Sequence, residues 1–190
     1  AQMTEDNQVI FPLRQGAKGV GAASRTAFAS LSGDPLFLAR EGVYAVTSNS
    51  VTSERAVKER SRRINKVLTE KDNLSEAVAA VWNGLYLLCV DGVCFVADSS
   101  RGVNDGGYEW YYWDNIPTRV FCEKDGTLYF GREDGALCRF SNDIDTMSRY
   151  YDDGAPIVAR WTTKAEDCGD FTRQKTLLKR GTGVLIRPYT

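Results

Sequence analysis

Short apolar runs separated by glycine turns recur along this chain. Three stretches share the same order of a turn glycine, an apolar or alternating run, an acidic residue next to a glycine, and a second run: Gly33–Thr47, Gly84–Asp98 and Gly126–Phe140. Runs of about five to eight residues rich in Val, Ile, Tyr, Phe and Cys are too short for helices and suit a pleated strand. Asp-Gly and Glu-Gly pairs supply the positive φ of tight turns. The pattern therefore predicts a β-hairpin used three times.

Each hairpin extends into a larger unit, because another apolar run precedes its first glycine: Thr26–Leu31, Ala77–Trp82 and Arg119–Glu123. After the second hairpin, Glu109–Trp113 predicts a fourth, outer strand. Equivalent glycines of the second and third hairpins are 42 or 43 residues apart, and the second-turn glycines of the first two hairpins are 50 apart. Four strands at a period of about 40 to 50 residues are typical of β-propeller blades. The sequence thus predicts an all-β fold with about three propeller blades, and an ordinary antiparallel meander or sandwich is the alternative.

The number of blades and the end of the repeat suggest a domain organisation. Propellers typically have about four to eight blades, so we expect these residues to be part of a longer propeller or one completed in trans. Val9–Leu13 is compatible with the outer strand of an earlier blade. We assign residues 1–154 to propeller blades with a basic insertion at 53–76, and residues 155–190 to the last propeller strands or the start of a β-sandwich. The runs that support the second assignment are Pro156–Thr163, Lys175–Lys179 and Gly183–Arg187.

The insertion is rich in basic residues, among them Arg60, Arg62 and Arg63. One interpretation is a basic arm that contacts nucleic acid or an acidic partner. The other, which the near-neutral charge of the whole chain favours, is a solvated loop with a helical turn that crosses between blades. A second short helix is predicted to start at Asn73, with Ser75 and Glu76 in a capping role.

The densest aromatic cluster lies in the predicted outer strand. Strand alternation places Tyr108, Trp110 and Tyr112 on one face and Tyr111 and Trp113 on the other. A stacking platform for sugars or single-stranded nucleic acid is one interpretation. Aromatic residues on both faces instead favour packing against the next blade and a flank or subunit. Together with the three arginines named above, these five residues form the candidate interaction surface.

Composition excludes several classes of function. The 24 basic and 25 acidic residues give a net charge of −1, which argues against a general polyanion binder. Histidine is absent, which excludes Ser-His-Asp and Cys-His catalysis and histidine-ligated metals. The four cysteines within apolar runs are expected to be reduced core thiols: Cys89, Cys94, Cys122 and Cys138. We expect no cofactor, no metal and no membrane span, since the apolar runs are shorter than the roughly 20 residues that cross a bilayer.

Three weaker patterns are interpreted as loops or surface charge. The Asp143-x-Asp145 pair lacks the later glycine and distal glutamate of a calcium loop. The glycines at 16, 19 and 21 lack the strand and helix of a nucleotide site. A glycosidase would need two carboxylates at a defined separation, and the sequence does not place any two of the candidates so: Asp98, Asp114, Asp134 and Asp153. We therefore predict that the chain is not an enzyme.

The order of motifs resembles the propeller region of tailed-bacteriophage structural proteins, including those that build tail nozzles and tail tips. The motifs are Leu36–Val46, Glu59–Asn65, Tyr86–Asp98, Trp110–Trp113, Leu128–Gly131, Asp134–Gly135, Tyr151–Ile157, Trp161–Thr163 and Lys175–Thr176. In that family, a blade of this kind leads through a D-(D)-G-x-P-I motif into a β-sandwich.

The resemblance implies a virion protein, made in the cytoplasm of the bacterial host, that works by assembly and brings no catalytic residues. Its implied partners are other tail proteins and further copies of itself, and nucleic acid would only pass through a channel. The alternative is a carbohydrate-binding propeller that attaches to host glycans through Trp110, Tyr112 and Trp113.

Overall fold

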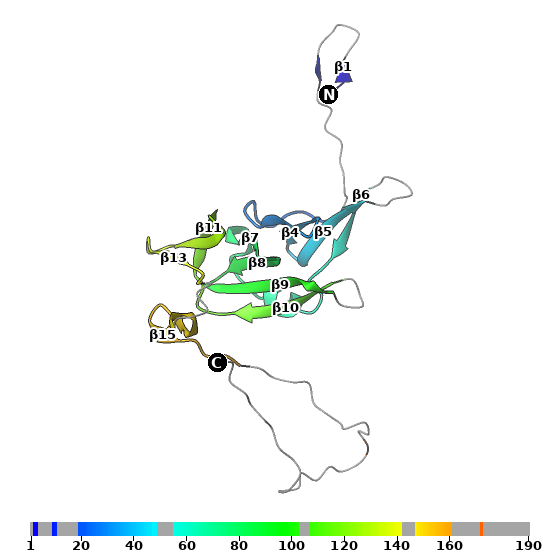
Figure 1. The fold of residues 1–190 in the computed structure, drawn as a ribbon. Helices are drawn as coiled ribbons and strands as arrows, with labels where there is room; N and C mark the ends of the chain where they lie inside the picture. The colour runs from blue at the N-terminus through cyan, green and yellow to red at the C-terminus, as the bar shows by residue number, and fades with distance from the viewer. Residues whose placement is uncertain are drawn as a thin grey trace.

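The computed structural model describes residues 2–3, 9–10, 19–48, 55–102, 107–141, 147–160 and 172. Within these residues the chain forms antiparallel β-sheets with a few short helices (Figure 1). The predicted all-β class is confirmed. Strands that follow one another in sequence are neighbours in every sheet, so each sheet is a simple meander.

Three sheets make up the body of the protein. The first has four strands, β3 (Phe28–Leu31), β4 (Asp34–Ala39), β5 (Gly42–Ser48) and β6 (Arg55–Glu59). The second also has four, β7 (Val78–Trp82), β8 (Leu85–Val90), β9 (Val93–Gly102) and β10 (Tyr108–Trp113). The third has three, β11 (Thr118–Lys124), β12 (Thr127–Arg132) and β13 (Leu137–Arg139). The predicted hairpins and the predicted outer strand at 109–113 are confirmed.

Short elements flank the sheets. Between the first and second sheets lie α1 (Asn65–Thr69) and the 3-10 turn η1 (Leu74–Glu76). After the third come η2 (Met147–Tyr150), β14 (Tyr151–Asp152) and β15 (Ala155–Pro156). Near the start, β1 (Gln2–Met3) pairs with β2 (Val9–Ile10), the described part of the run assigned to an earlier blade. Residues 157–160 are not in a strand, and the runs at 175–179 and 183–187 lie outside the described residues.

The first turn of each hairpin has the backbone that its sequence predicts. At the second sheet, φ is +50° at Asn83 and +75° at Gly84, and at the third it is +51° at Asp125 and +75° at Gly126. Positive φ at both central residues is the signature of a type I′ turn, whose twist matches that of the flanking strands.

Gly42 has a different role from the turn glycines. It pairs with Ala39 as the first residue of β5, so the turn itself is made by the two residues before it. A Cβ atom at Gly42 would lie 2.6 Å from both Ser61 Oγ and Asn65 Oδ1. Glycine is therefore needed because the crossing segment packs closely over the start of this strand.

The three sheets pack against one another through two hydrophobic cores. The first core, between the first and second sheets, contains Leu36, Leu38, Val43, Tyr86, Leu88 and Phe95. The second, between the second and third sheets, contains Leu87, Cys89, Val96, Leu128 and Phe130. Figure 1 shows the green second sheet adjoining both of the others. Successive residues of β8 thus face opposite cores, and burial on both faces explains why this strand is one continuous apolar run.

Part of the predicted basic insertion is a strand. Residues 55–59 form β6, the fourth strand of the first sheet, with Val57 opposite Val46 and Glu59 opposite Tyr44. This strand was not predicted from the sequence because its residues are mostly charged. β6 is an edge strand, where charged side chains are tolerated and prevent pairing with other chains. The helical turn expected in the crossing is α1, whose Leu68 is fully buried in the first core.

Candidate functional site

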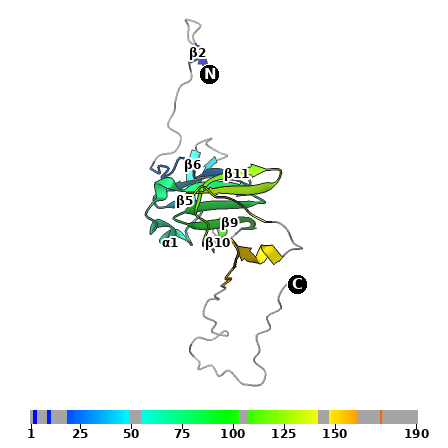
Figure 2. The ribbon, with the colours of Figure 1, turned by 90° about the vertical axis from the view of Figure 1, so that its left-hand side faces the viewer.

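The structure brings the aromatic outer strand and the basic segment together. The β10 strand is the edge of the second sheet, and Figure 2 shows α1 beside β9 and β10. At their meeting point, Arg60 Nη2 donates to Asp34 Oδ2 at 2.5 Å, and the Tyr108 hydroxyl donates to the same oxygen at 2.8 Å. The Arg60 guanidinium also lies 5.7 Å from the centre of the Tyr108 ring. We call these three residues the Asp34 junction.

The Asp34 junction is a structural joint rather than an open binding site. The Arg60 side chain is only 11% exposed and that of Asp34 only 28%. Burial, together with the hydrogen bond to Asp34, raises the pKa of Tyr108 to about 12, so its hydroxyl remains a donor at neutral pH. The indole N–H of Trp110 donates to the Arg60 carbonyl oxygen at 3.0 Å. These contacts fix β10 to the first sheet.

The other predicted surface residues divide into packed and exposed groups. Tyr108 and Trp110 pack against the first core, and Trp113 packs against the second. Tyr111 and Tyr112 are exposed, as are Arg62 and Arg63. Three of the five aromatic residues therefore attach β10 to the two cores, and two remain exposed to solvent.

An apolar groove lies between β10 and α1. It has a volume of about 330 Å³, and Trp110, Tyr111 and Tyr112 line it opposite Ile64 and Val67, with Arg63 also contributing. The Tyr112 ring meets Phe95 edge-on, with ring centres 5.5 Å apart, and Lys71 Nζ lies 5.8 Å from the Tyr112 ring centre. We call this feature the β10–α1 groove. None of the residues that line it is a carboxylate, and the groove offers aromatic faces, two tyrosine hydroxyls and the Arg63 cation.

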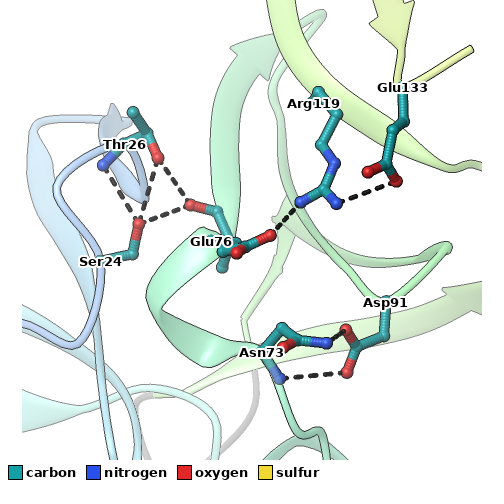
Figure 3. Close-up of polar contacts among 8 residues, drawn as sticks. Ser24, Thr26, Asn73, Glu76, Asp91, Arg119 and Glu133 are labelled. Carbon is teal, nitrogen blue, oxygen red and sulfur yellow. Dashed lines mark hydrogen bonds and ion pairs between the residues drawn. The ribbon is translucent and has the colours of Figure 1, made fainter.

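A second polar cluster surrounds η1 (Figure 3). Arg119 binds the carboxylates of Glu76 and Glu133, the latter at 2.9 Å. The hydrogen bonds and charges of Glu133 and then Glu76 raise the pKa of Arg119. Ser24 Oγ and Thr26 Oγ1 donate to the Ala77 carbonyl oxygen at 2.5 and 2.8 Å. The cluster therefore connects the segment before the first sheet, the segment before the second sheet and the third sheet itself.

Asp91 holds the same segment from the β8–β9 turn. Its carboxylate accepts the backbone N–H groups of Asp72 and Asn73 and the Asn73 side-chain amide. Desolvation, which raises the pKa of Asp91, is outweighed by these hydrogen bonds, so its pKa lies below the ordinary value. The predicted second short helix is η1, whose N-cap residue is Asn73 and makes no side-chain cap bond. Glu76, predicted to have a capping role, instead pairs with Arg119, and the Asp91 carboxylate accepts the Asn73 N–H.

Three of the four carboxylates considered for glycosidase chemistry bind other groups, and the fourth, Asp114, is exposed. Asp134 and Asp153 both pair with Arg132, at 2.7 and 3.2 Å. Asp98 accepts hydrogen bonds from the Ser100 hydroxyl and N–H, which lower its pKa, whereas a general acid needs a raised one. Asp143 and Asp145 lie outside the described residues, and the described part of the chain contains no cluster of potential metal ligands.

The cysteines follow the prediction with one exception. Cys89 and Cys94 are buried cross-strand partners, and burial raises the pKa of Cys94 well above the ordinary value. Cys138 is half-buried, but Cys122 is exposed, contrary to the prediction. The reason is its position on the side of the third sheet that faces away from the second core, where no other described sheet lies. Cys168 lies outside the described residues.

Comparison with known proteins found no protein-family model and no curated protein that matches this chain. The resemblance to phage tail proteins therefore stays a prediction that depends on the motifs quoted above. Within the described ranges, no helix is long and apolar enough to span a lipid bilayer.

Proposed function

We propose that this chain is a non-enzymatic structural component of a tailed-phage particle, a tail protein that acts by assembly through the faces of propeller blades. One observation carries the proposal: the two outer faces of the three described sheets carry exposed apolar side chains. Phe28 on the first sheet is 58% exposed, and Val120 and Leu137 on the third are 58% and 74% exposed. Apolar side chains gathered on a face in this way are typical of a surface that contacts another protein.

The arrangement of the first strands supports the propeller interpretation. Strand β3 contacts β7, and β7 contacts β11, so the first strands of successive meanders adjoin one another. Trp82 of β7 also donates its indole N–H to the Gly126 carbonyl oxygen in the next sheet, at 2.8 Å. Neighbouring inner strands with sheets packed face to face are what radial blades require.

The use of polar groups supports a non-enzymatic role. The ion pairs at Asp34, Arg119 and Arg132 connect strands or sheets to one another. In the described ranges, these charges hold the scaffold, and no carboxylate lines the β10–α1 groove, so it lacks the carboxylate pair of a glycosidase.

The test is the composition of particles. Purified particles of the phage or prophage that encodes this chain should contain it at a fixed number of copies, measured by quantitative mass spectrometry. Deletion of the gene should yield particles with incomplete tails in electron micrographs. Abundant protein in the lysate with none in purified particles would refute the proposal.

A second candidate function, binding of host glycans, is favoured by the β10–α1 groove. Its exposed tyrosines and apolar lining suit the faces of sugar rings. Binding on a glycan array should be lost in Tyr111→Ala and Tyr112→Ala and kept in Tyr151→Ala, another exposed tyrosine outside the groove. Equal binding by all three variants would exclude the groove as the glycan site.

A further inference from the structure

The three sheets are built on one pattern, in which the position after the turn glycine decides which way a side chain faces. We call the side of a sheet that points toward the next sheet its forward face, and the opposite side its backward face. In the second sheet, the third and fifth residues after Gly84 are Leu87 and Cys89, which lie in the second core and thus on the forward face. The second and fourth are Tyr86 and Leu88, which lie in the first core and thus on the backward face.

The same positions in the other two sheets obey this rule where a neighbouring sheet exists. In the first sheet, the forward residues Leu36 and Leu38 are fully buried in the first core. In the third, the backward residues Leu128 and Phe130 are buried in the second core. Among the described residues, two faces therefore have no neighbouring sheet of the kind that the repeat provides elsewhere: the forward face of the third sheet and the backward face of the first.

The forward face of the third sheet is apolar at its centre. Register places Val120, Gly131 and Leu137 in one row across the three strands, and Tyr129 is on the same side. A Cβ atom at Gly131 would lie 2.9 Å from Val120 Cγ1, so the valine side chain lies over the glycine and fills the row. Exposed Cys122, opposite Tyr129, belongs to this face.

The backward face of the first sheet is more strongly apolar. Its central row is Phe28, Phe37 and Tyr44, on three neighbouring strands. The rings of Phe37 and Tyr44 stack with centres 6.1 Å apart and planes inclined by 30°. Phe37 is nearly buried between its two neighbours, whereas Phe28 is exposed at the end of the row. A partner sheet would cover Phe28 in the way that the second sheet covers Leu36 and Leu38 on the other face of the first sheet.

We propose that the forward face of the third sheet of one copy of this chain packs against the backward face of the first sheet of a second copy. The contact between copies would then continue the two interfaces already present within the chain. A head-to-tail contact of this kind uses two different patches and produces a closed ring if the rotation closes and a filament if it does not. The inference rests on the proposed assembly function for its biological role, but the association of copies can be tested by itself.

Charge favours this pairing over a contact between identical faces. The forward face of the third sheet also carries Lys124 and Arg139, which are opposite Thr127 and Tyr129 in the register. The backward face of the first sheet carries Glu59, which is opposite Tyr44, is half-buried and accepts the Asn65 side-chain amide through one carboxylate oxygen. Two third-sheet faces would bring like charges together, whereas the head-to-tail contact places basic side chains against an acidic one.

The experiment uses two single variants of the full chain, Leu137→Glu on the third sheet and Phe28→Glu on the first, with Val158→Glu as the matched control. Val158 is strongly exposed and lies outside both faces. Sedimentation velocity is measured up to about 100 µM, where a Kd of about 1 µM gives nearly complete association. We expect the wild type and the control to form oligomers, and each face variant to be a monomer with an unchanged circular dichroism spectrum.

Mixing the two face variants is the decisive step. Each variant retains the face that the other has lost, so an equimolar mixture should form a one-to-one heterodimer and nothing larger. Alkylation of Cys122, followed by peptide mass mapping, should slow as the wild-type concentration rises. Should Leu137→Glu fail to fold, Arg139→Glu tests the same face, because it introduces repulsion against Glu59 at an exposed position.

Three results would overturn the inference. The first is a wild-type chain that is a monomer at all concentrations. Protection of Cys122 at every dilution would have the same meaning, because part of the same chain would then cover the face. The second is loss of association in Phe28→Glu but not in either third-sheet variant, which means that the first sheet pairs with itself. The third is a mixture of face variants that stays monomeric.

The failure of this inference can be distinguished from the failure of the proposed function. A monomer that is nevertheless present in particles would overturn this inference and leave the proposed function standing, while an oligomer absent from particles would do the reverse.

Discussion

Replacement of Asp34 by alanine tests whether the Asp34 junction positions the aromatic strand. Asp34 begins β4 in the first sheet, and its carboxylate receives hydrogen bonds from Arg60, which follows β6, and from Tyr108 on β10. The change removes the one acceptor that these two side chains share. We therefore expect the second sheet's outer strand to be less firmly attached and the whole domain to be less stable.

The magnitude follows from the partial burial of the pair. Exposed ion pairs contribute about 0 to 1 kcal/mol, and removal of one partner from a buried pair costs about 3 to 5 kcal/mol. The side chains of Asp34 and Arg60 retain some exposure, so a value of about 2 kcal/mol is expected for Asp34→Ala. In a domain of this length, that loss lowers Tm by about 4 to 8 °C. Tyr108→Phe removes only the hydroxyl and should cost about 1 kcal/mol.

The assay is urea unfolding at neutral pH, monitored by tryptophan fluorescence. A double-mutant cycle between Asp34→Ala and Tyr108→Phe should give a coupling energy of about 1 kcal/mol, because the Tyr108 bond has no acceptor once Asp34 is gone. Arg101→Ala is the control, since its pair with Glu109 on the same outer strand is exposed and 3.9 Å long. Unfolding free energies for Asp34→Ala and Arg101→Ala that agree within about 0.5 kcal/mol would refute the reasoning.

Three further predictions concern single positions. Gly42→Ala should lower the free energy of unfolding by about 2 kcal/mol, more than Gly92→Ala. Alanine is strained at both positions, where φ is +152° and +75°, but only at Gly42 does the new methyl group also meet Ser61 and Asn65. Equal losses in chemical denaturation would contradict this. Asp91→Ala should cost about 1 kcal/mol at pH 7. Since the folded pKa of Asp91 is depressed, its contribution is present above the unfolded pKa and is lost as pH falls through the folded one, so the difference from wild type measured by thermal melts should shrink below about pH 4. Cys89 and Cys94 should react with iodoacetamide only after unfolding, as mass spectrometry of alkylated peptides can establish; rapid alkylation of either in the native protein would mean that the second core is open.

The strand and turn pattern was largely predictable because it depends on local chemistry. Turns such as Asn83-Gly84 and Asp125-Gly126 require positive φ at two adjacent residues, and few residue pairs tolerate it. The apolar run of β8 was equally informative, since it is buried on both faces. Strand β6 was missed because an edge strand needs few apolar residues, and its charges resemble those of a loop.

The candidate site was predictable in its residues and not in its geometry. The sequence singled out the aromatic strand and the basic segment separately, about 50 residues apart. It offered no signal that Arg60 would turn inward onto Asp34 while Arg62 and Arg63 stay exposed. Which arginine is buried depends on the path of the chain between β6 and α1, a property of the folded chain rather than of composition.

The sequence by itself determined the all-β class, the positions of the hairpins and the alternation of side chains within each strand, because these follow from backbone conformations available to a few residues at a time. Tertiary structure alone decided which face of each sheet is covered. Leu87 and Leu137 are both apolar residues in short strands, yet the first is buried in a core and the second is exposed to solvent. The difference arises because burial depends on whether another sheet lies opposite, and that is a property of the whole stack of sheets.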